Sequence, residues 1–146
     1  MTLSAGTPAP KFTAKDTHGN TVSLADYAGK TIILYFYPKD DTPGCTKQAC
    51  GFRDNYAAYQ GKNIVVLGVS ADDEASHQAF TDKYDLPFPL LADVDRSIIK
   101  AYDVDNGSYA KRVTYIIDEK GTISHVYDSV QTATHATDVL AELAAA

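Results

Sequence analysis

Continuous apolar runs alternate with polar segments through the middle of the chain. Thr31–Tyr37 and Ile64–Val69 are rich in β-branched and aromatic residues without polar alternation, as expected of strands covered on both faces of a parallel sheet. The segments that follow them, Pro43–Tyr59 and Asp72–Tyr84, have the pattern of helices. This order of strand, helix, strand and helix predicts a right-handed parallel crossover.

Hairpin patterns flank this unit on both sides. Two short strand-like stretches in Phe12–Leu24 enclose Asp16–Asn20, where Gly and Asn tolerate positive φ, so we expect a hairpin at the edge of the sheet. Val113–Ile117 and Ile123–Tyr127 are joined by a short connection that contains glycine, which predicts a second antiparallel hairpin. The smaller predicted elements are a strand at Leu90 and Leu91, a helix over Ser97–Tyr102, and a C-terminal helix with an apolar stripe of Val139, Leu140 and Leu143.

The order of elements predicts an α/β protein with a thioredoxin-like fold, in which helices flank a mixed central β-sheet that carries an N-terminal β-hairpin. The 146 residues contain no internal repeat, low-complexity tract or linker, so residues 1–146 are expected to form a single domain. A chain of this length, with 45% hydrophobic residues, buries enough surface to fold without disulfides or a structural metal. Its two cysteines are therefore free for chemistry.

The chain is acidic, with 19 Asp and Glu residues against 13 Lys and Arg residues and a net charge of −6. Without a basic cluster, we expect neither nucleic acid nor a membrane as a partner. The apolar runs are far shorter than the ~18 residues of a membrane span, and residues 1–8 lack the basic and apolar regions of an export signal. The sequence therefore predicts a cytoplasmic, reducing location, where paired cysteines are more often catalytic, redox-active or metal-binding than structural.

Cys45 is the strongest candidate for chemistry because it stands where a strand leads into a helix. Pro38 ends the strand. Thr42 suits the N-cap and Pro43 the first helical position, which places Cys45 in the first turn. The unpaired amides there and the positive end of the helix dipole favour a thiolate, which is a nucleophile. The alternative is a small buried residue that happens to follow a helix cap.

Cys50 follows Cys45 by five residues on the same predicted helix. An intact helix holds the two Cα atoms roughly 8 to 9 Å apart and points the thiols in different directions, beyond the ~7 Å that a disulfide spans. The helix must therefore unwind before the two sulfurs bond. Gly51 weakens a helix by about 1 kcal/mol relative to alanine, which makes local unwinding easier. A redox-coupled conformational switch is our hypothesis.

Arg112 precedes a buried strand whose end is expected beside the Cys45 loop. Its guanidinium is a candidate for stabilising the thiolate and the charge that develops on a departing oxygen. A solvated charge at the edge of the sheet is the alternative. Lys47 and Arg53, on the helix itself, are rival cations, for which a solvated helix face is favoured.

Two other kinds of cysteine site compete with this interpretation. The histidines that a metal site would need show no HxxH or HxxxH pairing, so we expect no metal. The CxxC spacing of dithiol oxidoreductases is absent. An acyl-transfer site that pairs Cys45 with His125 or His135 stays open, although no local signature supports it. The four histidines are His18, His77, His125 and His135.

Pro38, Thr42 and Cys45 match the pattern of proline, three residues, threonine, two residues and cysteine, and the chain resembles the peroxiredoxins. Together with Cys50-Gly51-Phe52-Arg53-Asp54, it is similar over essentially its whole length to the bacterioferritin comigratory protein or peroxiredoxin Q subfamily, which is of the atypical 2-Cys type. Arg112 matches the active-site arginine of that family.

The resemblance implies a peroxidase that reduces hydrogen peroxide and organic hydroperoxides without a bound cofactor. Cys45 would attack the peroxide and become a sulfenic acid, which Cys50 would convert to an intramolecular disulfide. Thioredoxin or a similar dithiol would reduce that disulfide. The protein would be a monomer or a weak homodimer. A thiol-disulfide oxidoreductase and a redox-sensing thioredoxin-like module are the alternatives.

The resemblance also implies roles for the neighbours of Cys45. Thr42 would hydrogen-bond the sulfur and the peroxide, Arg112 would hold both, and Pro38 would shield the thiolate from water. Backbone amides of the loop after Pro38 would complete the peroxide site. One position departs from the subfamily, which usually has glutamate where this chain has Gln48. Glutamine keeps an acceptor for Arg112 but loses the charge.

Overall fold

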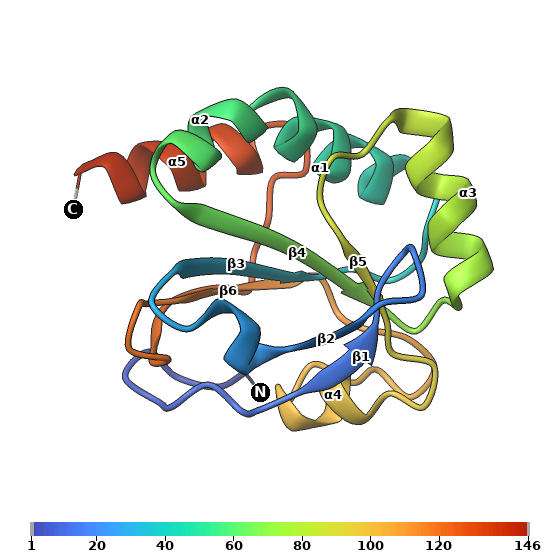
Figure 1. The fold of residues 1–146 in the computed structure, drawn as a ribbon, viewed down its shortest axis with the longest axis horizontal. Helices are drawn as coiled ribbons and strands as arrows, with labels where there is room; N and C mark the ends of the chain where they lie inside the picture. The colour runs from blue at the N-terminus through green and yellow to red at the C-terminus, as the bar shows by residue number, and fades with distance from the viewer. Residues whose placement is uncertain (1, 146) are drawn as a thin grey trace.

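The computed structural model of the protein describes residues 2–145 and contains one sheet of seven strands in the order β2-β1-β5-β4-β3-β6-β7. Helices cover both of its faces (Figure 1), with α1, α2, α3 and α5 on one face and α4 and the short helix η1 on the other. The predicted α/β class and the thioredoxin-like order of elements are confirmed.

The middle of the sheet consists of the strands that the apolar runs predicted. β3 (Thr31–Phe36) pairs in parallel with β4 (Ile64–Ser70) and antiparallel with β6 (Val113–Ile117). Nearly every side chain of these strands is buried, because helices pack on both sides. Tyr37, predicted as the last residue of β3, lies just beyond it but still donates its amide to the carbonyl of Val69.

Both predicted hairpins are confirmed, and each lies at one edge of the sheet. β1 (Thr13–Lys15) and β2 (Thr21–Ser23) form the N-terminal hairpin, and β6 pairs with β7 (Ile123–Tyr127) at the opposite edge. β5 (Leu90–Ala92) links the first hairpin to the parallel strands.

The helices lie where they were predicted, except that two helices stand where one was expected, with Asn55 between them. The single helix predicted over Pro43–Tyr59 is wrong, because Asn55 leaves helical geometry at φ −105° and ψ 7° and its amide side chain donates to the carbonyl of Gly51. η1 (Leu24–Tyr27) was not predicted. The other helices are α1 (Pro43–Asp54), α2 (Tyr56–Gly61), α3 (Glu74–Tyr84), α4 (Ser97–Ala101) and α5 (His135–Ala145).

α3 begins two residues later than predicted, because the Asp73 side chain accepts from the amide of Ser76 and caps the helix. On α5 the predicted stripe is confirmed: Val139 is fully buried, and Leu140 and Leu143 pack at the edge of the same apolar core. Across the described residues, no helix combines the length and apolarity that crossing a bilayer requires.

His135 fastens the start of α5 to the sheet and to α1. Its Nε2 lies 2.9 Å from the hydroxyl of Thr114 on β6, and its ring packs edge-on against Phe52 and Tyr127. Burial lowers the pKa of His135 from 6.5 to about 4, with the Arg112 charge acting in the same direction and Asp138 opposing. The imidazole is therefore neutral in the folded protein at neutral pH.

This buried neutral histidine predicts a loss of stability in acid. An unfolded chain binds a proton on His135 near pH 6.5, whereas the folded protein does so only near pH 4. Unfolding therefore becomes easier as the pH falls through that window, by roughly 2 to 3 kcal/mol. Urea denaturation across the window should show a His135→Gln variant losing less stability than the wild type.

The exposed His18 supplies a matched control. A His18→Gln variant should keep the wild-type dependence of unfolding free energy on pH. An equally steep dependence in the His135→Gln variant would contradict the assignment.

Candidate active site around Cys45

Cys45 lies in the first turn of α1, where the sequence predicted it. Thr42 occupies the N-cap with extended backbone angles, and Pro43 is the first helical residue. Cys45 is 1% exposed and belongs to the apolar core between the sheet and the helices. Its sulfur is a free thiol.

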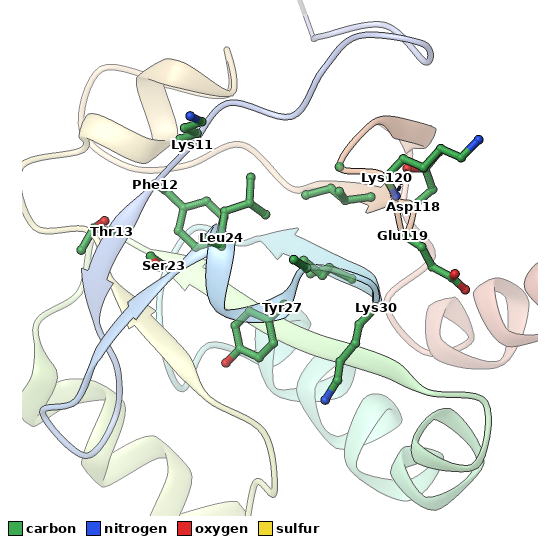
Figure 2. A pocket seen from close by; sticks show the side chains of 15 residues that line it. Lys11, Phe12, Thr13, Ser23, Leu24, Tyr27, Lys30, Asp118, Glu119 and Lys120 are labelled. Carbon is green, nitrogen blue, oxygen red and sulfur yellow. Dashed lines mark hydrogen bonds between the residues drawn. The ribbon is translucent and has the colours of Figure 1, made fainter.

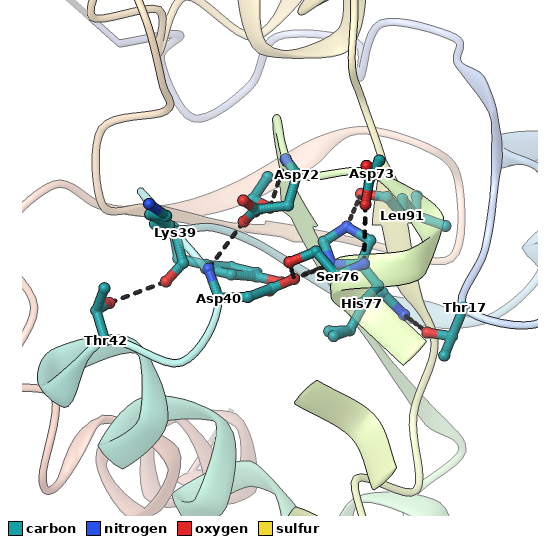
Figure 3. A network of polar contacts seen from close by, with 12 residues as sticks. Thr17, Lys39, Asp40, Thr42, Asp72, Asp73, Ser76, His77 and Leu91 are labelled. Atoms are coloured by element: carbon teal, nitrogen blue, oxygen red, sulfur yellow. Dashed lines mark hydrogen bonds and ion pairs between the residues drawn. The ribbon is translucent and has the colours of Figure 1, made fainter. Parts of the chain in front are cut away.

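The N-terminal amides of α1 lack the usual side-chain cap. The Thr42 hydroxyl donates to the carbonyl of Lys39 at 2.9 Å (Figure 3), and it makes no capping bond to the helix. The first turn is closed by the Thr46 amide, which donates to the Thr42 carbonyl at 2.8 Å. Within the described residues, the amides of Gly44 and Cys45 have no hydrogen-bond partner, which leaves two donors beside the sulfur.

Arg112 reaches this turn from the residue before β6. Its Nη2 donates to the Sγ of Cys45 at 3.2 Å, and its Nη1 donates to the Oε1 of Gln48 at 2.8 Å. The rival cations lie elsewhere: Lys47 is exposed, and Arg53 donates to the Tyr84 carbonyl and pairs with the neighbouring Asp54. The guanidinium next to the thiol is therefore that of Arg112.

Gly44 makes room for this guanidinium. A Cβ atom at Gly44 would lie 3.1 Å from Nη2 of Arg112, which is closer than nearly all such contacts. A side chain at this position would displace the guanidinium by a few tenths of an ångström. The absence of one lets a cation lie directly over the start of the helix.

Gln48 completes the cation's surroundings without adding charge. The residue is 1% exposed, and its Oε1 accepts from Arg112. Its Nε2 is buried without a hydrogen-bond partner among the described residues. Arg112 thus faces one potential anion, the Cys45 sulfur, and one neutral acceptor.

Pro38 lies just beyond the end of β3, beside a cavity whose lining includes none of Cys45, Thr42 and Arg112. Pro38 is half-buried and lines a cavity of about 440 Å³ together with Lys39, Asp72 and Tyr109. The Asp40 amide, one of the loop donors expected to face a peroxide, instead donates to the carboxylate of Asp72 at 2.8 Å.

Cys50 lies on the same unbroken helix as Cys45, and the two thiols are free and unbonded. Cys50 is half-buried. The next residue, Gly51, packs against α5: a Cβ built on it would lie 3.4 Å from the Cβ of Ala136. Joining the two sulfurs therefore requires unwinding of α1, in the stretch where Gly51 lies against α5.

The histidines do not form a cysteine–histidine pair in the described structure. His125 Nδ1 lies 2.9 Å from the Ser124 hydroxyl, and His135 contacts Thr114. Neither ring makes a hydrogen bond to Cys45, so the arrangement for acyl transfer is not formed. His77 instead belongs to a cluster with Asp40, which is also buried, and the half-buried Asp72. The sequence analysis missed this cluster because Asp40 stands 32 positions before Asp72 and 37 before His77.

A second cavity, of about 430 Å³, lies near the start of β3, whereas Cys45 lies on α1 beyond the end of that strand (Figure 2). Phe12, Leu24 and Ile32 contribute to its walls, and Lys30 and Lys120 stand at its rim. None of the predicted site residues lines this cavity.

Comparison with known proteins places the chain in a family. A profile described as the AhpC/TSA family matches residues 5–126. The chain is 48% identical over 130 residues to the chloroplastic peroxiredoxin Q of Triticum aestivum. The matched residues make up 87% of this chain and 60% of that protein. It is 45% identical over 151 residues to a Coxiella burnetii protein that carries the name peroxiredoxin bcp, covering 98% of this chain and 100% of that protein.

A solved structure agrees with these likenesses. The crystal structure of a cysteine-to-serine mutant of Xylella fastidiosa PrxQ matches with a TM-score of 0.93 at 30% identity, covering 99% of this chain and 98% of that one. This chain spans about 60% of the length of the wheat relative. The profile, the relatives and the shared fold show that the chain belongs to the AhpC/TSA family, among the peroxiredoxins of the Q or bacterioferritin comigratory type.

Proposed function

We propose that the protein is a thiol peroxidase that reduces hydrogen peroxide and organic hydroperoxides, with Cys45 as its nucleophile. The observation that carries the proposal is the 3.2 Å contact between Arg112 Nη2 and the Cys45 sulfur at the uncapped start of α1. A cation and two free amides favour the thiolate, which is the reactive form of cysteine. The peroxiredoxin names of the relatives support the same activity.

The proposed first step transfers one oxygen atom to sulfur. The Cys45 thiolate attacks the terminal oxygen of the hydroperoxide, the O–O bond breaks, and the cysteine becomes a sulfenic acid. The other oxygen leaves with its electron pair and takes up a proton, forming water or an alcohol. Arg112 and the free amides of Gly44 and Cys45 supply hydrogen-bond donors for the negative charge that moves onto this oxygen.

The proposed role of Thr42 changes with the observed hydrogen bond. Its one hydroxyl proton is donated to the Lys39 carbonyl, so the hydroxyl does not donate to the sulfur in this state. Its oxygen keeps lone pairs that accept a hydrogen bond from the O–H of a peroxide. Thr42 would then orient the substrate, while Pro38 limits the access of water from the side of the loop.

Cys50 is proposed as the resolving cysteine. Its thiolate attacks the sulfenic sulfur, hydroxide leaves as water after protonation, and an intramolecular disulfide forms. Because α1 holds both cysteines in one helix, this step follows unwinding around Gly51. A thioredoxin-type dithiol then restores the two thiols by exchange. A reducing cytoplasm, the proposed location, supplies such a dithiol.

The spacing and the helix disfavour the alternative of a general thiol-disulfide oxidoreductase. Such an enzyme needs two thiols that bond without large rearrangement, as in CxxC motifs at a helix end. Here the pair is five residues apart within an intact helix. A redox-sensing module without turnover is distinguished from the peroxidase by the experiment below.

Replacing each cysteine separately tests the two proposed roles. Cys45→Ser should abolish peroxide consumption, because no other thiolate lies at the Arg112 site. Cys50→Ser should still consume one peroxide per chain at close to the wild-type rate, and its Cys45 sulfenic acid should persist. Stopped-flow measurement of peroxide loss, with mass spectrometry after trapping with dimedone, follows both outcomes.

The oxidised wild type should also lose amide hydrogen protection across residues 44–52, whereas Cys50→Ser should keep it after the same treatment. Equal loss of peroxide consumption in the Cys45→Ser and Cys50→Ser variants would refute the assignment of Cys45 as the nucleophile. Unchanged protection after disulfide formation would refute the unwinding step.

Gln48 offers a test of the electrostatic part of the proposal. Gln48→Glu keeps the side-chain shape but places a second anion against Arg112, which competes with the Cys45 thiolate for the guanidinium charge. The rate of Cys45 alkylation by iodoacetamide at neutral pH should fall by roughly threefold to tenfold. The ultraviolet absorbance of the thiolate should fall with it.

Lys47→Gln changes the charge of the helix by the same single unit from an exposed position, so it should alter the alkylation rate less than about twofold. A Gln48→Glu variant as reactive as the wild type would show that the charge of Arg112 does not activate the thiol.

A further inference from the structure

A buried carboxylate holds the middle of the loop between β3 and α1 (Figure 3). Asp40 accepts hydrogen bonds from the hydroxyl of Tyr37 at 2.6 Å and from that of Ser76 at 2.8 Å, and its Oδ2 lies 2.6 Å from Nδ1 of His77. The Asp40 side chain is almost wholly buried. Three side chains thus fix one loop residue, two of them from α3.

His77 is itself held at both ring nitrogens. Its side chain is 0% exposed, and Nε2 lies 2.9 Å from the carbonyl oxygen of Leu91 on β5. Because a carbonyl oxygen only accepts, Nε2 donates, and the imidazole is clamped between β5 and Asp40. The loop is thereby tied to the sheet through a rigid ring.

Further contacts tie neighbouring loop atoms to the segment from the end of β4 through α3. The amide of Asp40 donates to Asp72 at 2.8 Å, and the same Asp72 oxygen accepts from the Ser70 hydroxyl at 2.8 Å. Asp41, in the left-handed region at φ 55°, accepts from Lys83 at 2.9 Å on the exposed side. The loop conformation is therefore set by α3 together with the residues between β4 and α3.

The cluster of Asp40, Asp72 and His77 resembles a metal-binding group in its residue types, with ligand atoms within 4.8 Å of one another. The contacts argue for a different role. Both ring nitrogens of His77 and both carboxylate oxygens of Asp40 already have protein partners. These atoms are occupied in holding the loop.

We propose that Asp40 and His77 are positioning residues that fix the loop carrying Pro38 and Thr42 against Cys45 during the reaction with peroxide. The inference rests on the proposed peroxidase function. Asp40 lies midway between Pro38 and Thr42, so a shift of Asp40 moves both walls of the substrate site. A displacement of about 1 Å of such groups can slow a reaction by up to about a hundredfold.

Two pairs join the loop to α3: Asp40 with His77, and Asp41 with Lys83. The pair of Asp40 and His77 is the stronger anchor because it is buried. Removing one member of a buried hydrogen-bonded pair leaves the other without its partner in a dry environment, and the loop relaxes to regain water. The exposed pair of Asp41 and Lys83 is already solvated, so its loss changes little.

The experiment compares two reactions of the same sulfur. Oxidation by hydrogen peroxide needs the loop groups in place, whereas alkylation by iodoacetamide needs chiefly the thiolate. His77→Leu and Asp40→Ala remove the anchor from opposite sides. Each should lower the peroxide rate constant by about tenfold or more while changing the alkylation rate less than about twofold.

Two further variants serve as matched controls. Asp40→Asn keeps an acceptor oxygen for Tyr37 and places an NH2 group where Oδ2 lies, which can donate to Nδ1 of His77 and to the Ser76 hydroxyl oxygen, so it should stay within about threefold of the wild type in both reactions. Asp41→Asn keeps a residue type that tolerates positive φ but removes the charge facing Lys83, and it should leave both rates within about twofold.

The outcomes separate this inference from the proposed function. A wild type that does not consume peroxide overturns the peroxidase itself. With an active wild type, a disruptive variant that lowers thermal stability but keeps the ratio of the two rates overturns the positioning role. Asp40→Ala decides the question if His77→Leu does not fold, and circular dichroism establishes which variants are folded.

Discussion

The contact between the Arg112 guanidinium and the Cys45 sulfur is the interaction on which the site depends. It joins two distant parts of the chain, since Arg112 precedes β6 and Cys45 begins α1. The antiparallel pairing of β3 with β6 brings them together, because Phe36 near the end of β3 stands opposite Val113 at the start of β6. The register of the central sheet thus sets the distance between the cation and the thiol.

Two local features accompany this contact: a glycine beside the guanidinium and a helix start without a side-chain cap. Gly44 leaves space for the guanidinium, and Thr42 directs its proton to Lys39, away from the helix. The helix start therefore keeps free amides that a better cap would consume, and such a cap is typically worth about 1 kcal/mol. The uncapped turn thus lowers local stability and leaves two donors free beside the sulfur.

The sequence was sufficient for the parts governed by local pattern. Strands such as β3 and β6 are uniform apolar runs, and Thr42, Pro43 and Cys45 stand at fixed offsets from a helix start. Polar contacts between residues far apart in the chain leave no comparable pattern in the sequence. Asp40 and His77 are 37 positions apart, and each alone resembles an ordinary loop or helix residue. The break at Asn55 depends on a side chain that bonds its own backbone, which competes with helix propagation without disturbing the apolar pattern.

The packing of Gly51 against Ala136 has a consequence for the fate of the oxidised sulfur. In the proposed cycle, the Cys50 thiol comes within reach of a sulfenic acid on Cys45 only after α1 unwinds. During that interval a second peroxide molecule would compete with Cys50, and oxidation to the sulfinic level would be a dead end for the proposed cycle. Under that proposal, the strength of the contact between α1 and α5 would set how many turnovers each molecule completes before it is inactivated.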